Sequence, residues 1–512
     1  MSQIPYGVHW FRRDLRVAGN PALQWNWKQH RGRVLGLFAF DRKFLSRPDF
    51  SHNRFAFFLQ TLKVLRDELR SVGGDLLVLD VGPEHAFQQL FAALEARQLA
   101  RPAAVSFNRD YEPFARERDG RISTWLPQTF GVAVHTERDH VLIEPDELTR
   151  DGAPGALYQV YSPFAKRWFD RLATDDVRQR IESQKKALAY LDDRRSGKVD
   201  GGLFSLTWSA LFGGTCPVED HLDASIAANS AHVTVPIPPA GSLAALERLR
   251  EFRRRSLKDY KDRRDYPSVD ATSRLSIYFK NGSITPAMVL AETGLEHSEF
   301  KNKDGPTHFV KEIAWREFYY HVLHHRPEVE HSAFLERYRD LPWENREDWF
   351  EAWKQGLTGF PIVDAGMRQL LTTGWMHNRV RMIVASFLTK DLLIDWKWGE
   401  RWFMEQLLDG DLAPNNGGWQ WAASTGCDPQ PYFRIFNPKL QSEKFDGDGD
   451  YIREFVPELR EVNSRAIHEP YAHGYVGAYP APIVEHSVQR DKALSLYRIE
   501  SGDGDQHSEA QG

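Results

Sequence analysis

Short apolar runs alternate with amphipathic stretches over the first third of the chain. Residues 54–72 carry apolar side chains at helical spacing, and Asn20 followed by Pro21 is typical of a helix start. The alternation predicts a parallel sheet, which binds ligands at the carboxyl ends of its strands. We therefore expect a Rossmann-like, doubly wound α/β domain over residues 1–140. Its strands are predicted at residues 6–11, 33–40, 75–80, 103–108 and 131–136.

The pattern changes twice further along the chain. Residues 190–242 are rich in Gly, Ser, Pro and Asp, which predicts a long connection over the surface. From residue 243 the apolar positions recur at helical spacing almost to residue 460. We expect an interdomain connection over 141–242, a larger all-α domain over 243–490, and a polar disordered tail over 491–512.

Composition narrows the class of protein. The 512 residues are 41% hydrophobic and 27% charged, and the net charge of −5 argues against a generally basic nucleic-acid binder, although a local basic patch remains compatible with it. No apolar run reaches the roughly 18 residues of a membrane span, and the N-terminus lacks the apolar stretch of a signal peptide. Two cysteines cannot make a disulfide framework. We expect a soluble, cytoplasmic monomer without a metal site.

The most distinctive stretch begins at residue 409 and contains Asn415-Asn416-Gly417-Gly418. Asn and Gly tolerate positive φ, so these four residues predict a turn whose bare backbone lets a ligand approach. Trp419 and Trp421 follow two residues apart and are expected to face different partners. The alternative is a Trp-rich helical core next to a glycine turn.

Thr272 and Ser273 precede an amphipathic segment that begins at Arg274. Hydroxyls, backbone N–H groups and an arginine at a helix start can bind an anion. The simpler alternative is an ordinary helix cap with a surface arginine.

In each of two further predicted helices, a set of residues lies on one face. Glu312 and Trp315 could bind and stack on a nucleobase, or they could be a solvated acid beside a core indole. Asn378, Arg381 and Met382 also lie on one helical face, and taken in isolation they indicate polar surface and core filler.

Taken together, these motifs resemble those of the photolyase/cryptochrome family, most closely the class I photolyases that repair cyclobutane pyrimidine dimers. The resemblance runs from WFRRDLR at 10–16, through TSRLS at 272–276, KEIAWRE at 311–317 and WMHNRVRM at 375–382, to PIVEH at 482–486. It implies an FAD-binding helical domain and a light-driven lyase that flips a dimer out of single- or double-stranded UV-damaged DNA and splits it by electron transfer from reduced FAD.

The resemblance also implies roles for individual residues. A chain of Trp343, Trp396 and Trp419 would carry an electron from the surface to the flavin, and Arg381 would pair with Asp409 beside it. Residues implied to bind FAD are Tyr260, Thr272, Ser273, Arg274, Leu275, Ser276, Asn378, Arg381, Asp409, Asp411 and Asn415. Those implied to bind the dimer or DNA are Arg264, Glu312, Trp315, Asn378, Arg379, Met382, Trp421 and Arg434.

Residues 108–119 lie where relatives bind a second, light-harvesting chromophore. Folate-binding relatives carry an Asn-Glu pair where this chain has Phe114 and Ala115, whereas Asp110 and Glu112 look more like the deazaflavin type. Both 5,10-methenyltetrahydrofolate and an 8-hydroxy-deazaflavin therefore stay open.

Two other functions are compatible with the sequence. One is a cryptochrome-like blue-light photoreceptor without repair activity, against which Glu312, Trp315, Asn378 and Met382 argue. The other is a non-catalytic flavoprotein or an aromatic-rich DNA-binding module.

Overall fold

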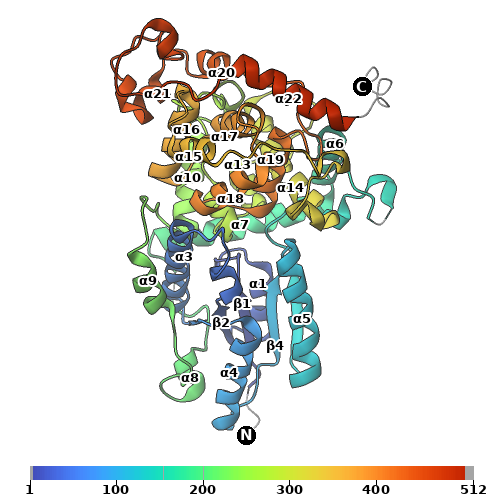
Figure 1. Cartoon of the computed structure of the whole chain (residues 1–512). Coiled ribbons are helices and arrows are strands. Elements are labelled where there is room, and N and C mark those ends of the chain that lie inside the picture. Colours follow the sequence, from blue (N-terminus) through green and yellow to red (C-terminus); the bar gives the residue numbers. More distant parts are fainter. Residues whose placement is uncertain (1–3, 154, 200, 502–512) are drawn as a thin grey trace.

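The computed structural model describes residues 4–153, 155–199 and 201–501. Its N-terminal part is a parallel sheet of five strands in the order β3-β2-β1-β4-β5, with helices on both faces (Figure 1). This order is doubly wound, as predicted, and each predicted strand lies within two residues of an observed one. The strands are β1 Gly7–Phe11, β2 Val34–Ala39, β3 Leu76–Leu79, β4 Ala104–Asn108 and β5 Ala133–Glu137.

Local sequence explains where these elements begin. The side chain of Asn20 accepts a hydrogen bond from Leu23 N, and Pro21 occupies the first helical turn of α1. Every residue of β1, β2 and β4 is buried, as expected for strands covered on both faces. The helices of this part are α1 Pro21–Gln29, α2 Arg42–Leu45, α3 His52–Ser71, α4 Pro83–Ala96 and α5 Pro113–Phe130.

The predicted surface connection is more structured than its composition suggests. It contains α6 Tyr161–Leu172, α7 Asp175–Arg195, α8 Trp208–Phe212 and α9 Leu222–Ser230, together with the short turns η1 Pro145–Glu147 and η2 Arg150–Gly152. The indole of Trp208 is buried and donates to Gly36 O of β2 at 3.0 Å. The connection over 190–242 therefore contains helices, and buried anchors such as Trp208 fix it against the sheet.

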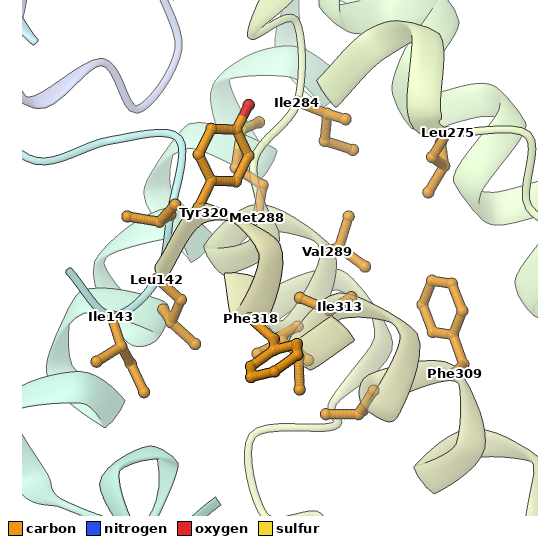
Figure 2. Close-up of a cluster of buried hydrophobic side chains, with 14 of the residues drawn as sticks. Leu142, Ile143, Leu275, Ile284, Met288, Val289, Phe309, Ile313, Phe318 and Tyr320 are labelled. Carbon is orange, nitrogen blue, oxygen red and sulfur yellow. The ribbon is translucent and has the colours of Figure 1, made fainter. Parts of the chain in front are cut away.

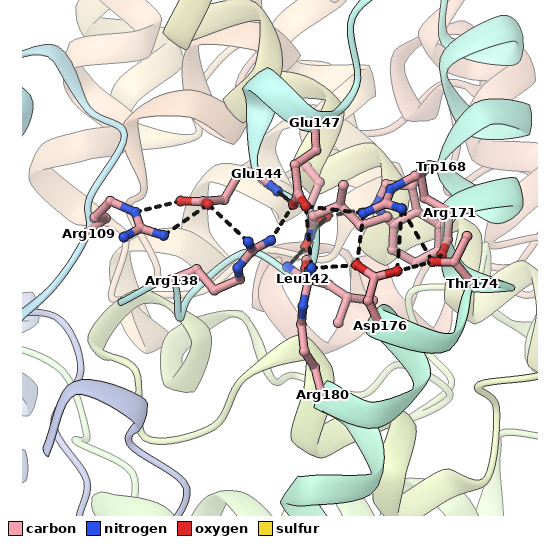
Figure 3. Close-up of polar contacts among 12 residues, drawn as sticks. Arg109, Arg138, Leu142, Glu144, Glu147, Trp168, Arg171, Thr174, Asp176 and Arg180 are labelled. Carbon is pink, nitrogen blue, oxygen red and sulfur yellow. Dashed lines mark hydrogen bonds and ion pairs between the residues drawn. The ribbon is translucent and has the colours of Figure 1, made fainter. Parts of the chain in front are cut away.

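A polar network fastens the beginning of this connection (Figure 3). Glu144 accepts two hydrogen bonds from Arg109, at 2.7 and 3.0 Å. Glu147 forms ion pairs with Arg138, Arg171 and Arg180. These contacts join the segment around η1 both to the α/β domain and to α6 and α7.

The remainder of the chain is helical. Its core forms around α14, where Phe309, Ile313 and Phe318 pack against residues of α12 and α13 and against Leu142 and Ile143 of the connection (Figure 2). The helices are α10 Gly241–Arg255, α11 Tyr260–Arg263, α12 Ser276–Asn281, α13 Pro286–Thr293, α14 Gly305–His325, α15 Glu347–Gln355, α16 Pro361–Thr373, α17 Asn378–Ser386, α18 Trp396–Gln406, α19 Leu412–Ala422, α20 Pro438–Phe445, α21 Asp450–Phe455 and α22 His486–Ser501. A π-helical turn, η5 Phe387–Asp391, continues α17, and the remaining short helices are η3 Pro327–Glu330, η4 Glu336–Tyr338, η6 Pro457–Leu459 and η7 Pro470–His473.

The end of the chain corrects one prediction. Residues 491–501 were expected to be disordered, but they belong to α22, where Gln489 donates to Asp391 O at 2.6 Å and Tyr497 is fully buried. Residues 502–512, the rest of the predicted tail, lie outside the described residues. Within the described part of the chain, no helix is long and apolar enough to cross a membrane.

Candidate functional site

The predicted turn at residues 415–418 is instead the middle of helix α19. A Cβ added to Gly417 would lie 2.0 Å from the Tyr319 ring of α14, so this glycine allows two helices to approach closely. Gly399 of α18 does the same for Trp419, whose ring lies 2.2 Å from where its Cβ would be. The glycines therefore serve helix packing rather than a turn.

Trp419 and Trp421 have different environments, as their spacing predicts. Trp419 is 2% exposed and packs edge-on against Phe403, with ring centroids 4.9 Å apart. Trp421 is only partly buried and lies beside the same hydrophobic cluster.

Asp409 is the centre of a polar group that joins three segments. Its carboxylate accepts a hydrogen bond from Ser276 Oγ at 2.6 Å and pairs with Arg381 Nη2 at 2.9 Å, as the sequence suggests. Arg381 also donates its Nε to Met376 O at 2.8 Å. Its Nη1 has no protein partner among the described residues, so it can donate to a ligand beside Asp409.

The segment around Ser273 is not an ordinary helix cap. Helix α12 begins at Ser276, two residues later than predicted, and Arg274 has a positive φ of 52°. The exposed Arg274 lies over the Trp375 ring, 4.4 Å from its centroid. Arg248, which sequence reasoning missed, donates to Thr272 O and Ser273 O at 2.8 and 2.9 Å. Arg248 thereby fixes the two carbonyls, while Ser273 Oγ accepts a hydrogen bond from Leu275 N at 3.4 Å.

Other residues expected at the cofactor have more structural roles. Tyr260 and Leu275 belong to the core, with Leu275 fully buried, so Leu275 can offer a ligand only its backbone. Asn415 donates to Glu400 O at 3.1 Å, and the neighbouring Asn416 donates to the Glu400 carboxyl at 2.9 Å. Burial raises the pKa of Glu400 to about 8, so this carboxyl is largely protonated at neutral pH.

Asp411 does not join the Asp409 group. Its carboxylate binds Arg13 of the α/β domain at 3.1 Å, Lys280 at 3.1 Å and the hydroxyl of Tyr320 at 2.7 Å. Burial alone would raise the pKa of Asp411, but Arg13 and Lys280 outweigh it and hold the pKa well below its usual value. The side chain of Asp411 therefore joins the two halves of the molecule.

The residues expected to bind the dimer lie on α14 and α17. Trp315 stacks flat on Tyr161, with ring centroids 3.6 Å apart and an interplanar angle of 8°. Glu312 is held in an ion pair by Arg264. Asn378 is exposed, and its amide lies 3.9 Å from the sulfur of the partly buried Met382.

Two arginines predicted to bind DNA phosphates differ in whether an acidic residue of the protein already pairs with them. Arg379 pairs with Asp265 at 2.9 Å and lies over the Phe445 ring. Arg434 is exposed and forms no ion pair with any residue that the structure describes. Tyr161, which sequence reasoning did not assign to the site, could have been suspected from its place in the YQVYSPF motif.

The three predicted electron-transfer tryptophans follow a gradient of burial. Trp343 is partly exposed, whereas Trp396 and Trp419 are each 2% exposed. Glu344, the residue after Trp343, donates its backbone N–H to Leu393 O at 2.9 Å. Leu393 lies three residues before Trp396 in the sequence. Trp419 in turn packs on Gly399, one turn after Trp396. The contacts thus bring the segments that carry the three indoles together.

A large cavity lies at the carboxyl edge of the sheet, with about 1140 Å³ of empty space including the part open to solvent. Aromatic side chains, among them Trp10, Phe38 and Phe50, form much of its wall. Ile277 and Leu408 close it from the helical side, and they directly adjoin Ser276 and Asp409 in sequence. The residues singled out in the sequence, Asp110, Glu112, Phe114 and Ala115, also line this cavity.

Known proteins are similar to this chain over nearly its whole length. Residues 7–183 match the family model described as DNA photolyase, and residues 309–499 match the FAD binding domain of DNA photolyase. A deoxyribodipyrimidine photo-lyase of Alkalihalophilus pseudofirmus is 39% identical over 510 residues, which cover 96% of this chain and 97% of that protein.

Solved structures agree with the sequence matches. A class III photolyase from Agrobacterium tumefaciens is 33% identical with a TM-score of 0.79, and the match covers 98% of both chains. A photolyase from Sulfolobus tokodaii with two FAD molecules is 30% identical with a TM-score of 0.75, covering 96% of this chain and 99% of the other. From these matches and the geometry of the site, the chain belongs to the DNA photolyase family and contains the FAD-binding domain of that family.

Proposed function

We propose that this protein splits cyclobutane pyrimidine dimers in DNA with light, using FAD held in the helical domain. The observation that carries the proposal is the Ser276–Asp409–Arg381 group. Glu312, on the same helix as Trp315, is linked to Arg379 of α17 through ion pairs of Arg264 and Asp265. The site combines a polar flavin site with a flat aromatic and acidic wall suited to a pair of bases. The reaction class is that of a carbon–carbon lyase.

The residues present fit FAD. Arg381 has a free Nη1, and His377 Nε2 is buried with no hydrogen-bond partner among the described residues. Thr272, Ser273 and Arg274 would hold the pyrophosphate, since Arg248 turns the carbonyls of this segment away. Once bound and reduced, FAD supplies an electron to the dimer on absorbing near-UV or blue light.

The protein's own contribution is to bind and orient the dimer. Trp315, fixed by Tyr161, stacks on a pyrimidine ring, and the Glu312 carboxylate, anchored by Arg264, accepts hydrogen bonds from a base edge. A dimer inside a duplex must be flipped out to reach this wall. Both bonds that join the bases break and the electron returns, so the reaction consumes neither water nor protons and no nucleophile is needed.

The test combines an absorption spectrum with a repair assay in light and in darkness. The purified protein should carry one FAD per chain and should remove dimers from DNA only under illumination after reduction. A colourless protein that takes up no added FAD would end the proposal, and flavin binding without light-dependent repair would favour a photoreceptor.

DNA binding should be salt-dependent in spite of the negative net charge, because local arginines displace counterions from phosphates. Arg434→Ala should reduce the slope of log K against log salt by roughly 0.7–0.9, the contribution of one phosphate contact. The measurement is fluorescence anisotropy with dimer-containing DNA at several salt concentrations. Arg97→Ala is the matched control, since this exposed arginine ends α4 at the far end of the sheet (Figure 1).

If Arg434→Ala keeps the wild-type slope while Arg97→Ala also leaves it unchanged, Arg434 lies outside the interface. The class I assignment rests on the resemblance in the sequence, and repair assays on defined dimers test it.

We further propose that the cavity at the sheet edge binds a second chromophore of the flavin or deazaflavin type. Its aromatic wall suits a tricyclic ring, and Arg12 and Arg118, which both pair with Asp119, also line it. The absence of the Asn-Glu pair at Phe114 and Ala115 argues against a folate.

Incubation with an 8-hydroxy-deazaflavin or with excess FAD should therefore give a second bound chromophore, detected by sensitised flavin fluorescence. Ala115→Leu should reduce this binding, because Ala115 is 4% exposed and a larger side chain reduces the space in the cavity. Preferential binding of 5,10-methenyltetrahydrofolate would contradict the proposal.

A further inference from the structure

Three potential metal ligands meet where η1 approaches the end of helix α14. Asp146 comes from η1, and His324 and His325 are the last two residues of α14. One ligand atom from each residue lies within 4.8 Å of the others, and His324 Nε2 is 3.1 Å from Asp146 Oδ1. The sequence alone gives no sign of this cluster, because Asp146 and His324 are 178 residues apart.

Asp146 is the one carboxylate of its turn that faces the histidines. Its neighbours Glu144 and Glu147 are engaged by arginines, as Figure 3 shows. Asp146 is 73% exposed and pairs with no arginine or lysine in the described part of the chain. A carboxylate that only a histidine contacts can bind a cation without breaking an ion pair.

A third histidine helps to fix the turn. His321 uses both ring nitrogens, since Nε2 accepts from Tyr158 N at 3.1 Å and Nδ1 lies 3.3 Å from Pro145 O. His321 is therefore a support rather than a ligand. His325 Nε2 lies 3.5 Å from the same carbonyl oxygen, a long contact that leaves this nitrogen available.

We propose that Asp146, His324 and His325 bind one Zn²⁺ ion, with solvent or Pro145 O as the fourth ligand. Two imidazoles and a carboxylate suit zinc better than Mg²⁺ or Ca²⁺, which prefer oxygen ligands alone. With Zn–N bonds of about 2.1 Å, the ligand atoms of a tetrahedral site lie about 3.4 Å apart. The three ligand atoms, now within 4.8 Å of one another, would therefore approach by up to about 1.4 Å. Small rotations of the three side chains, of which Asp146 is the most exposed, would supply this movement.

The bound ion has a structural role. It joins the start of the connection to α14, the helix that also carries Glu312 and Trp315. Because it closes a long loop of the chain and binds only the folded protein, it stabilises the fold. It does not take part in the light-driven reaction, so this proposal stands independently of the proposed function.

The experiment uses the flavin-loaded full-length protein without a polyhistidine tag, stripped of metal by a chelator. Titration calorimetry with Zn²⁺ should show one site per chain, and Zn²⁺ should raise the melting temperature. His324→Gln and Asp146→Asn should each weaken Zn²⁺ binding at least tenfold and remove the temperature shift. His331→Gln, which changes an exposed histidine outside the cluster, should behave like the wild type.

Three results would overturn the proposal: no stoichiometric binding, unchanged binding in both cluster variants, or an equal loss in His331→Gln. If a cluster variant folds poorly, the visible absorption spectrum of the Co²⁺-loaded wild-type protein tests the site instead. Visible absorption typical of tetrahedral nitrogen and oxygen ligation supports the site, and a spectrum of six-coordinate Co²⁺ in water contradicts it.

Discussion

Trp343→Phe is expected to stop photoreduction of the oxidised flavin while leaving repair by the chemically reduced enzyme intact. Phenylalanine fills much of the same space but is far harder to oxidise, so the partly exposed outer end of the proposed tryptophan chain no longer supplies an electron. We expect the rate of photoreduction to fall about 100-fold, equivalent to about 2.7 kcal/mol in barrier height. Folding should survive, because hydrophobic swaps that nearly conserve volume usually cost less than about 1.5 kcal/mol.

Trp315→Ala should give the opposite phenotype. It should photoreduce normally but lose affinity for dimer-containing DNA, since stacking on a base contributes roughly 1–3 kcal/mol. Flavin absorbance during illumination with an external donor measures the first property, and dimer loss followed by DNA absorbance measures the second.

The matched control for the tryptophan chain is Trp125→Phe, which changes a partly buried indole of α5 in the other domain. It should leave both properties unchanged. If the flavin of Trp343→Phe is photoreduced at the wild-type rate, Trp343 serves only in packing and the electron reaches the flavin by another route.

Gly417→Ala and Gly418→Ala should change stability in opposite directions although the residues are adjacent in one helix. At Gly417 the new methyl group would lie 2.0 Å from the Tyr319 ring, and such overpacking typically costs about 1–3 kcal/mol. The gain in helix propensity, about 1 kcal/mol, offsets only part of it. At Gly418 nothing lies within 4 Å, so the propensity gain should appear alone.

Urea unfolding followed by circular dichroism and by flavin fluorescence gives the sign of each change. Because Tyr319 also packs against Trp315 at 5.7 Å, Gly417→Ala should in addition weaken DNA binding. Two variants with the same sign would show that α19 and α14 do not pack as described, or that a turn replaces the helix in solution.

The sequence predicted the fold where periodicity was strong. The strands follow from buried apolar runs that alternate with amphipathic stretches, the doubly wound class that we expected is observed, and Asn20 with Pro21 marks the start of α1. It failed at Asn415–Gly418, where the residue types favour a turn but tertiary packing against Tyr319 demands small residues in a helix. The packing of α19 against Tyr319 outweighs the local preference of these residues for a turn, and no local sequence pattern reveals that contact.

The candidate site was predicted in part for a similar reason. The pairing of Arg381 with Asp409 followed from the resemblance, and the structure confirms the ion pair. Arg248 and the interdomain partners of Asp411 could not be found in this way, because they depend on which side chains distant segments place together. The shape of the cavity at the sheet edge likewise exists only once the helical domain closes it through Ile277 and Leu408.

The salt-bridge cluster of Arg13, Asp411 and Lys280 has an optical consequence. Arg13 and Lys280 line the cavity, and their ion pairs with Asp411 tie the α/β domain to the helical domain, so neither half can rotate without separating these buried charges. Excitation energy passes between two chromophores with an efficiency that depends on the angle between their transition dipoles. By holding the domains in one orientation, the cluster would fix that angle for FAD and the second chromophore that we propose, so the efficiency of energy transfer would depend on these ion pairs as well as on the pigments.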